Sequence, residues 1–369
     1  MFVSQSSGCW EEERVALLQL TPFFNLQDWV EGDQQNNSDC CQWERVECNN
    51  STGRVITLDL ESTRNPELGE WHLNASLFSA FEQLEWLRLW GNSISGFVDN
   101  GGLDKPLRLR NLEILDLAYN MFNNDIFLSL NALPSLKFLD LFDNRLNETV
   151  DLQGLDSCKN LENLDLSHNQ IEKVIFPKGL DKLSTLTKLE FLGLGGNMFN
   201  NDILLSINDF PSLIYLDLSD NRLNETADLQ GLDSSKNLMD LVLRNNQIEK
   251  VVFPKGLDSL NNLSYLDMGF NDIENFIFPK GNDETKGCTG LRKLKTLDLS
   301  GLNVINGSSL LQSLGSFPSL KTLYLSSSKF SDSTTNRVIF NPRNSNSLAD
   351  VLAKQRLWSN GDTVEWGVW

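Results

Sequence analysis

One leucine pattern recurs along most of the chain and limits what the chain can fold into. The spacing Leu-x-x-Leu-x-Leu-x-x-Asn-x-Leu appears about ten times, as in NLEILDLAYNMF from Asn111 and SLKFLDLFDNRL from Ser135. The alternating leucines predict a short strand with one apolar face. A single unit cannot bury that face, whereas stacked units can. The pattern therefore predicts a solenoid of parallel strands around a continuous leucine core.

A long internal duplication extends this pattern. Residues 120–183 and 197–260 align without gaps at 48 identical positions of 64. The period of 77 residues is too long for one unit, and it divides into leucine units of 24, 25 and 28 residues. We therefore expect that the duplication lengthened a scaffold, and we expect binding residues among the mismatches. The outward mismatches are Phe142 against Ser219, Asp165 against Val242 and Asn163 against Asp240.

An asparagine follows the strand leucines in most units. These residues are Asn92, Asn120, Asn144, Asn169, Asn197, Asn221, Asn246 and Asn271. An inward asparagine at a strand exit can bond backbone groups that the neighbouring turn leaves without partners. The pattern therefore predicts a structural ladder rather than a functional site.

The recurring pattern resembles the leucine-rich repeat signature. The resemblance implies an α/β solenoid, a right-handed superhelix with a parallel β-sheet on its concave face and a disulfide-clamped N-terminal cap. We divide the chain into a cap at residues 1–53, about ten to eleven repeats at 54–330, and a C-terminal tail at 331–369 that is foreign or disordered. Leu302 and Ser328 stand at the asparagine position of the last two units, which predicts that the solenoid ends near them.

Four of the six cysteines, Cys9, Cys40, Cys41 and Cys48, lie near the N-terminus. The segments around them, CWEEERVALLQL and CCQWERVECNNSTGRVITLDL, resemble the N-terminal cap of plant extracellular leucine-rich repeat receptors and receptor-like proteins. By that resemblance, Cys9 bridges Cys40 and Cys41 bridges Cys48.

The bridges would clamp an amphipathic helix over the apolar end of the first repeat. We expect that helix around Val15, Leu17 and Leu18. We also expect Trp29 and Trp43 to belong to the core of the cap rather than to a ligand site.

The other two cysteines, Cys158 and Cys288, lie about five repeats apart, or roughly 24 Å at the spacing of parallel strands. That separation is too large for a disulfide. Because Ser235 replaces Cys158 in the second copy, we expect two free and dispensable thiols.

Disulfides indicate an oxidising compartment, and N-x-S/T sequons agree with it. The candidate glycosylation sites are Asn36, Asn49, Asn50, Asn74, Asn147, Asn224, Asn262 and Asn306. Asn147 and Asn224 are equivalent in the two copies, so we expect both on one face of the coil, exposed, and glycosylated if the chain is secreted.

Only MFVSQSSG precedes Cys9, and no stretch is long and apolar enough to cross a membrane. Two expectations stay open. Either the true start of the protein lies further upstream and the protein is extracellular or associated with the plasma membrane, as the resemblance implies. Or this chain is a truncated product that stays in the cytosol.

Residues typical of catalysis are scarce. The chain has two histidines, His72 and His168, and no CxxC pair, phosphate loop, HExxH or kinase signature. Asn245 replaces His168 in the second copy, which indicates a polar surface residue. We therefore predict no enzyme activity, no cofactor and no metal site.

The tail segment NPRNSNSLADVLAKQ resembles the last helix of plant ribonuclease H-like domains, in which the Asp of the AD dipeptide, here Asp350, is a metal ligand. The other carboxylates of that domain are absent, so we infer no nuclease activity. The segment also fits an amphipathic helix capped near Ser347. Gene fusion or a shifted exon is a third explanation.

The outward strand positions stack across the concave surface, which we call the sheet face. Its middle positions are mostly aspartate, and aromatic residues flank them. The candidate ligand-binding residues are Trp86, Arg88, Trp90, Tyr119, Phe138, Asp140, Phe142, Asp165, Phe191, Tyr215, Asp217, Tyr265 and Asp267. Exposed rings beside carboxylates suit a basic peptide, through stacking, apolar burial and charge steering. An acidic face that is only solvated is the alternative.

The formal net charge of −19 argues against nucleic acid or an anionic membrane as partners. The resemblance implies the non-catalytic ectodomain of a plant receptor-like protein, which binds a peptide or protein in extracellular signalling or defence. Because the chain has no kinase, the resemblance also implies a kinase co-receptor. The alternatives are a secreted inhibitor of a cell-wall-degrading enzyme, like the polygalacturonase inhibitors, and a nonfunctional gene fragment.

Overall fold

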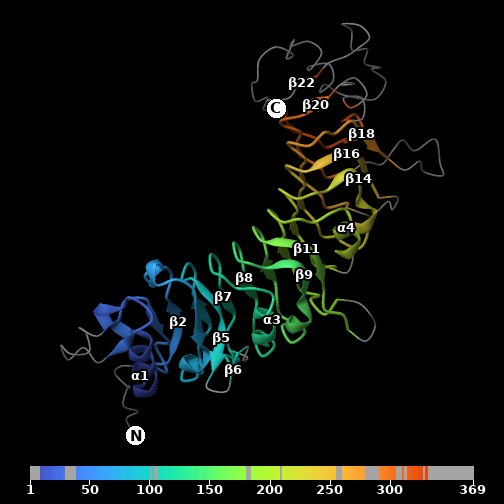
Figure 1. The fold of residues 1–369 in the computed structure, drawn as a ribbon. Coiled ribbons are helices and arrows are strands. Elements are labelled where there is room, and N and C mark those ends of the chain that lie inside the picture. The colour runs from blue at the N-terminus through green and yellow to red at the C-terminus, as the bar shows by residue number, and fades with distance from the viewer. Residues whose placement is uncertain are drawn as a thin grey trace. The chain divides into compact units, whose positions relative to one another are not determined.

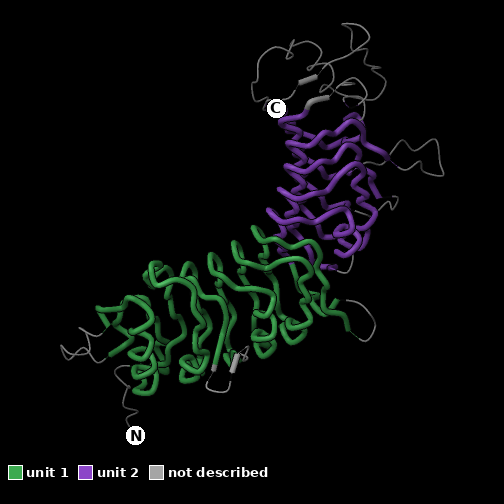
Figure 2. The backbone as a smooth tube through the Cα atoms, viewed as in Figure 1, with its two compact units in different colours: residues 1–189 green, residues 190–369 purple. Residues whose placement is uncertain are grey.

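The computed structural model describes residues 9–29, 39–99, 102–103, 107–179, 184–207, 210–254, 260–278, 291–304, 310, 314–326 and 329–330. Asn36, Cys288, Asn306 and the tail at 331–369, which includes Asp350, lie outside the described residues. The chain divides into two compact units, residues 1–189 (unit 1) and residues 190–369 (unit 2), and each is described by itself (Figure 2).

The cap at the start of unit 1 is held by two disulfides. Its short elements are helix α1 (Glu11–Leu20), the 3-10 turn η1 (Cys40–Gln42) and strand β1 (Val46–Cys48). Cys9 is bonded to Cys40 and Cys41 to Cys48, with Cα atoms 5.4 and 5.5 Å apart, which confirms the predicted pairing. Because Cys9 directly precedes α1, the first bridge ties this helix to the segment that leads into β1.

Helix α1 turns a different side inward than the sequence suggested. Ala16, Leu17 and Leu20 are buried, whereas Val15 is 41% exposed and Leu18 is half-buried. The helix expected around Val15, Leu17 and Leu18 is therefore present, but Val15 lies on its exposed side. The helical period of 3.6 residues places Leu17 and Leu20 on one side and carries Val15 to the opposite side.

A carboxylate on the buried side of α1 fastens the helix to the first repeat. Glu13 is fully buried, and its Oε2 accepts a hydrogen bond from the backbone N–H of Val55 at 3.0 Å. Its Oε1 lies 3.4 Å from Nη1 of Arg54. Burial raises the pKa of this carboxyl, and the bonds to Val55 and Arg54 oppose that shift.

Two tryptophans form the centre of the cap, as predicted. Trp29 and Trp43 are both buried, and their rings stack with centroids 5.7 Å apart. The indole N–H of Trp29 donates to the carbonyl of Glu44 at 3.0 Å. A buried indole usually has such a partner, so these rings serve packing rather than recognition.

Unit 1 continues as stacked turns with a parallel sheet along one side (Figure 1). Its parallel strands are β2 (Val55–Asp59), β4 (Trp86–Arg88), β7 (Ile114–Asp116), β8 (Phe138–Asp140) and β10 (Asn163–Asp165), with β1 antiparallel to β2. The other elements are η2 (Pro66–Leu68), β3 (Trp71–Asn74), η3 (Ala75–Phe78), β5 (Ile94–Asp99), β6 (Gly102–Leu103), α3 (Ile126–Ser129), β9 (Asn147–Asp151), η4 (Leu152–Leu155) and β11 (Gln170–Ile175).

Unit 2 repeats this organisation. Its parallel strands are β12 (Phe191–Gly193), β13 (Tyr215–Asp217), β15 (Asp240–Val242), β17 (Tyr265–Asp267), β19 (Thr296–Asp298) and β21 (Thr322–Tyr324). The other elements are α4 (Asp202–Ser206), β14 (Asn224–Asp228), η5 (Leu229–Leu232), β16 (Gln247–Val252), β18 (Asn275–Ile277), β20 (Asn303–Val304) and β22 (Lys329–Phe330).

The strand register aligns equivalent positions of successive repeats. Leu115 pairs with Leu139, and both are fully buried. On the outward side Asp116 pairs with Asp140, and Asp140 pairs with Asp165. The predicted solenoid, with leucines inside and aspartates on the sheet face, is confirmed in the strands of both units.

The ladder asparagines bond the backbone of neighbouring turns, as predicted. In Asn144, Oδ1 accepts from the N–H of Phe122 at 3.0 Å, and Nδ2 donates to the carbonyl of Leu117 at 3.0 Å. The same Nδ2 also reaches the carbonyls of Leu141 and Phe142 within its own turn. A single buried amide therefore joins two consecutive repeats.

Cys158 is a free cysteine buried in unit 1. Burial raises the pKa of its thiol to about 11, so the thiol stays protonated and unreactive at neutral pH. Ser235, its counterpart in the second copy, is also fully buried. The thiol of Cys158 therefore acts as a small core residue.

The Glu13 contact predicts a stability test of the cap. Glu13→Ala leaves the N–H of Val55 buried without its acceptor, so the free energy of unfolding should fall by about 2–3 kcal/mol. Urea unfolding of the oxidised protein measures this loss. Glu12→Ala, which removes an exposed carboxylate from the neighbouring position, should change the free energy by less than about 0.5 kcal/mol. Equal losses in the two variants would refute the role of Glu13.

The ladder predicts a second stability effect. Asn144→Ala removes one acceptor and one donor shared by two repeats, so we expect a loss of about 2 kcal/mol or more in urea unfolding. Asn160→Ala is the matched control, because Asn160 is half-exposed and its two side-chain bonds, from Nδ2 to the carbonyl of Pro134 and from the ammonium of Lys188 to Oδ1, are both exposed to solvent. A loss for Asn144→Ala no larger than that of the control would contradict the ladder interpretation.

Candidate ligand-binding surface

The strand aspartates of both units share one local geometry. In each of them Oδ1 accepts a hydrogen bond from the backbone N–H two residues later, at 2.7 to 3.1 Å. The bonded pairs are Asp59 with Glu61, Asp116 with Ala118, Asp140 with Phe142, Asp165 with Ser167, Asp217 with Ser219, Asp267 with Gly269 and Asp298 with Ser300. This bond fixes each carboxylate at the strand exit and leaves Oδ2 available to a second partner.

Arg88 neutralises the first part of the acidic sheet face. Its guanidinium lies 3.6 Å from Oδ2 of Asp59, 3.3 Å from Oδ2 of Asp116 and 2.9 Å from Glu61. It also lies 5.3 Å from the ring of Trp86, which is 37% exposed. The expected run of unpaired carboxylates therefore needs correction here, and Arg88 holds structural ion pairs.

Asp140 and Asp165, which we call the carboxylate pair, lie beyond Arg88 on strands β8 and β10 and are partners in the register. Within the described ranges neither carboxylate has an ion pair. Burial raises the pKa of the Asp140 carboxyl to about 7, and the charges of Asp165 and Asp116 add to this shift. The folded state therefore binds this proton more tightly than the unfolded chain, so Asp140 destabilises the fold as the pH rises from about 4 to 7.

Four rings line up beside the carboxylate pair, and we call them the ring row: Trp90, Tyr119, Phe142 and His168. Successive ring centroids are 4.9, 5.2 and 4.7 Å apart. Tyr119 is 45% exposed, His168 is exposed, and the other two rings are half-buried. Phe138 is half-buried on β8. Three of the predicted candidates of unit 1, Trp90, Tyr119 and Phe142, thus form a continuous row of rings with His168, which the sequence indicated only as a polar surface residue.

Tyr119 is held in a backbone conformation that is unfavourable for a large side chain. Its φ is 53°, in the left-handed region. The residue before the ladder asparagine has positive φ in the other turns as well, where it is Gly91, Asp143, His168, Gly196, Asp220, Asn245 or Phe270. Glycine and asparagine adopt this conformation readily, whereas a bulky residue there is strained. The scaffold alone does not require a ring at this position.

Unit 2 carries a separate set of candidates. Phe191 and Tyr215 stack with centroids 4.8 Å apart, and both are half-buried. Burial raises the pKa of the Tyr265 hydroxyl to about 12, and this hydroxyl donates to Oδ2 of Asp267 at 3.4 Å. Asp267 itself is buried, and Asp217 is half-buried.

Arg244 is a sheet-face residue that the sequence reading missed. Its guanidinium lies 3.9 Å from Oδ2 of Asp267, 3.9 Å from Oδ2 of Asp298 and 4.4 Å from the ring of Phe270. Phe270 is 44% exposed and has a φ of 56°. The signal was present in the sequence, because Arg244 replaces Ser167 between the two copies.

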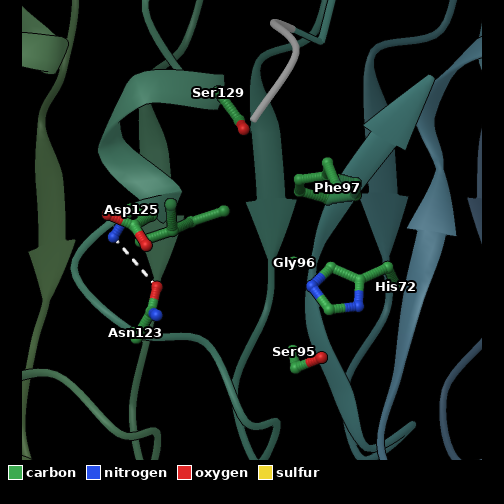
Figure 3. Close-up of a pocket in the computed structure, with 8 residues that line it drawn as sticks. His72, Ser95, Gly96, Phe97, Asn123, Asp125 and Ser129 are labelled. Carbon is green, nitrogen blue, oxygen red and sulfur yellow. Dashed lines mark hydrogen bonds between the residues drawn. The ribbon is translucent and has the colours of Figure 1, made fainter. Parts of the chain in front are cut away.

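A small pocket of about 240 Å³ lies away from the sheet face of unit 1 (Figure 3). His72 of β3 and Ser95 of β5 line one side, and Asn123 and Asp125 line the other. The sequence did not predict this pocket, because its lining comes from three different repeats.

Among the residues that the structure describes, no group of His, Cys, Asp and Glu is arranged to bind a metal ion.

Family comparisons agree with this architecture. Models described as leucine-rich repeat N-terminal domain, leucine-rich repeats in two copies and Zer-1-like leucine-rich repeats match residues 11–49, 134–179 and 204–316. In the part of the chain with described structure, no helix is both long and apolar enough to traverse a bilayer.

Curated relatives are plant receptors. The chain is 34% identical to Cuscuta receptor 1 of Solanum lycopersicum over 240 residues, which cover 61% of this chain and 21% of that protein. It is 39% identical to Receptor-like protein 9a of Arabidopsis thaliana over 155 residues, which cover 42% of this chain and 16% of that protein. The chain thus spans about a fifth or less of the length of these relatives.

Among solved structures, that of PEPR1-AtPEP1 superimposes with a TM-score of 0.59 at 24% identity. The match covers 87% of this chain and 42% of that chain, and it shows the shared fold alone.

Repeats, cap, disulfides and relatives together lead to one assignment. The chain is built of leucine-rich repeats, and its N-terminal cap and repeats are similar to those of plant receptor-like proteins.

Proposed function

We propose that this chain is a ligand-binding ectodomain, or part of one, of a plant receptor-like protein. It recognises a peptide or protein ligand of basic character on the sheet face, at the extracellular side of the plasma membrane. Signalling would then pass through a kinase co-receptor. The observation that carries the proposal is the exposed ring row beside the carboxylate pair in unit 1.

The ring row has the properties of a recognition surface. Rings that only stabilise the fold are buried, like Trp29 and Trp43 in the cap, whereas the ring row remains accessible to solvent. A contiguous exposed apolar surface of this kind is typical of interaction sites. Its four turns span roughly 14 Å at the spacing of adjacent strands, which matches about four residues of an extended peptide.

The comparisons support the receptor part of the proposal. Cuscuta receptor 1 and Receptor-like protein 9a are named as receptors, and both resemble this chain at more than 30% identity. The cap disulfides suit an oxidising extracellular compartment.

A binding screen tests the proposal directly. The full chain would be produced through a secretory pathway, checked for both disulfides, and exposed to peptide and protein libraries on a sensor surface. We expect saturable binding that a variant of the ring row weakens. Saturable binding that is indifferent to the ring row would place the ligand elsewhere and overturn the proposed surface.

The ring row should be separable from stability. Tyr119→Asn combined with Phe142→Ala is expected to weaken ligand capture about tenfold or more, because it removes two adjacent rings of the ring row, one exposed and one half-buried. Tyr119→Asn relieves backbone strain, so the melting temperature of that single variant should stay constant or rise.

The control is Leu128→Ala, which removes an exposed apolar side chain from α3, away from the sheet face, and should leave binding unchanged. Calorimetry of all variants decides between recognition and packing. A parallel loss of folding and binding on removal of the rings would show that they are part of the core.

Two sequons lie at exposed and equivalent positions of the two copies. Asn147 and Asn224 begin the exposed strands β9 and β14 at equivalent places in the two copies. By contrast, Asn262 is half-buried, and its side chain bonds the carbonyl of Lys236 and the ammonium of Lys293. We expect glycopeptide mass spectrometry of the secreted protein to show high occupancy at Asn147 and Asn224 and lower occupancy at Asn262. The reverse order would contradict this assignment.

A further inference from the structure

The chain itself shows how the sheet face holds a guanidinium. Arg88 lies between Asp59 and Asp116 of the two flanking strands and approaches the Oδ2 atom of each, with its shortest contact to Glu61 and the ring of Trp86 beside it. In the other unit, Arg244 approaches two strand aspartates and the ring of Phe270. In both cases the backbone already occupies Oδ1, so the arginine uses the remaining oxygen of each carboxylate. Two aspartates and one ring thus form a recurring arginine seat.

The carboxylate pair has the same elements without an arginine from the chain. Asp140 and Asp165 are adjacent in the register, and the backbone N–H groups of Phe142 and Ser167 bind their Oδ1 atoms. The ring of Phe142 belongs to the exposed ring row. In the described part of unit 1 no cation is paired with either carboxylate.

The position of the missing arginine can be located by equivalence. Arg244 follows the last leucine of its strand segment, and its two aspartates lie on the next two strands, β17 and β19. In unit 1 the equivalent residue is Ala118, which follows Leu117 of the β7 repeat, because Asp140 and Asp165 lie on the next two strands, β8 and β10. A methyl group therefore stands where unit 2 supplies a guanidinium.

We propose that the carboxylate pair, together with the rings of Tyr119 and Phe142, forms a subsite for the guanidinium of an arginine side chain in the ligand. This inference rests on the proposed function and names the chemistry that the ligand must present. A planar guanidinium can donate to Oδ2 of both aspartates and stack on a ring at the same time, whereas a lysine ammonium offers a point charge and no plane.

The subsite can be tested before the natural ligand is known. The probe is N-acetyl-arginine N-methylamide, titrated into the full-length secreted protein and followed by saturation-transfer NMR. Its citrulline analogue has nearly the same shape without the charge, and its lysine analogue has the charge without the plane. We expect the arginine probe to bind about tenfold more tightly than the citrulline probe, and more tightly than the lysine probe.

Variants assign the binding to this place. Asp140→Asn combined with Asp165→Asn should weaken arginine binding about tenfold or more, since both charged acceptors are lost. The charge-matched control is Glu148→Gln with Glu172→Gln, which removes two exposed carboxylates from β9 and β11 and should leave binding unchanged. Unaltered binding in the Asp140/Asp165 variant, or equal binding of arginine and citrulline probes, would overturn the subsite.

A second variant keeps both carboxylates and supplies the arginine from within. Ala118→Arg copies the relation of Arg244 to its aspartates, so we expect it to abolish binding of the arginine probe. The equivalent positions of other turns hold Trp90, Phe142 and Arg244. Ala118 itself is only 2% exposed, so the melting temperature of the variant is measured first, and binding is compared only if the variant is folded. Probe binding equal to that of the unaltered protein would count against the seat.

The pH provides an independent check. Charged groups that face Asp140 are Asp116 and Asp165 on the flanking strands, with Arg88 beyond Asp116. Burial raises the pKa of Asp140 to about 7, so probe binding should be stronger at pH 8 than at pH 5, where this carboxyl is neutral. Equal binding at the two pH values would contradict the role of Asp140.

The outcome separates the subsite from the proposed function. A screened ligand that binds through the ring row but ignores the Asp140/Asp165 variant would leave the receptor proposal standing and remove the arginine seat. If binding of the arginine probe depends on the carboxylate pair but no ligand that needs the ring row is found, the arginine seat would stand and the receptor proposal would fall.

Discussion

Each turn of the coil leaves backbone N–H and C=O groups at the strand exits, and the ladder asparagines are the partners that make stacking possible. The side chain of Asn144 accepts a hydrogen bond from the preceding repeat, and it donates to carbonyls of the preceding repeat and of its own repeat. The backbone of a turn is therefore fully hydrogen-bonded only when the neighbouring turn is present. Buried peptide groups without partners are expensive. The leucine core supplies the apolar driving force for stacking, and this amide ladder makes the stacked arrangement specific.

Because that constraint acts inward, the outward residues of the strands are free to vary. The internal duplication shows the consequence. The two copies keep their strand leucines and ladder asparagines, yet one has Asp165 and Ser167 where the other has Val242 and Arg244. One copy therefore carries a pair of adjacent carboxylates, and the other contributes an arginine that is held by aspartates of the following strands. A scaffold was copied, and its surface chemistry then diverged.

The aspartates of the sheet face therefore differ, since some are paired with an arginine of the chain and others are not. Arg88 and Arg244 each lie within ion-pair distance of two strand aspartates, so four carboxylates of the sheet face are paired within the chain. The carboxylate pair is different, since burial holds the pKa of Asp140 near neutrality and opposes folding when that carboxyl ionises. Together with a tyrosine in a strained backbone conformation, this pair marks a place where the fold gives up stability. Such features are typical of functional sites.

The amino-acid sequence by itself determined the solenoid and the asparagine ladder, because both follow from local periodicity. The pairing of the cap cysteines came from the resemblance of the cap segments to a known family. It also named most residues of the sheet face, since alternation along a strand decides which side chains point outward. Only the tertiary structure decided which of those residues act together. The inward side of α1, the bridging by Arg88 and Arg244, and the alignment of the ring row all depend on the distances between turns. Periodicity gives a side chain its direction, whereas its partners across the stack come from residues that are 20 or more positions away.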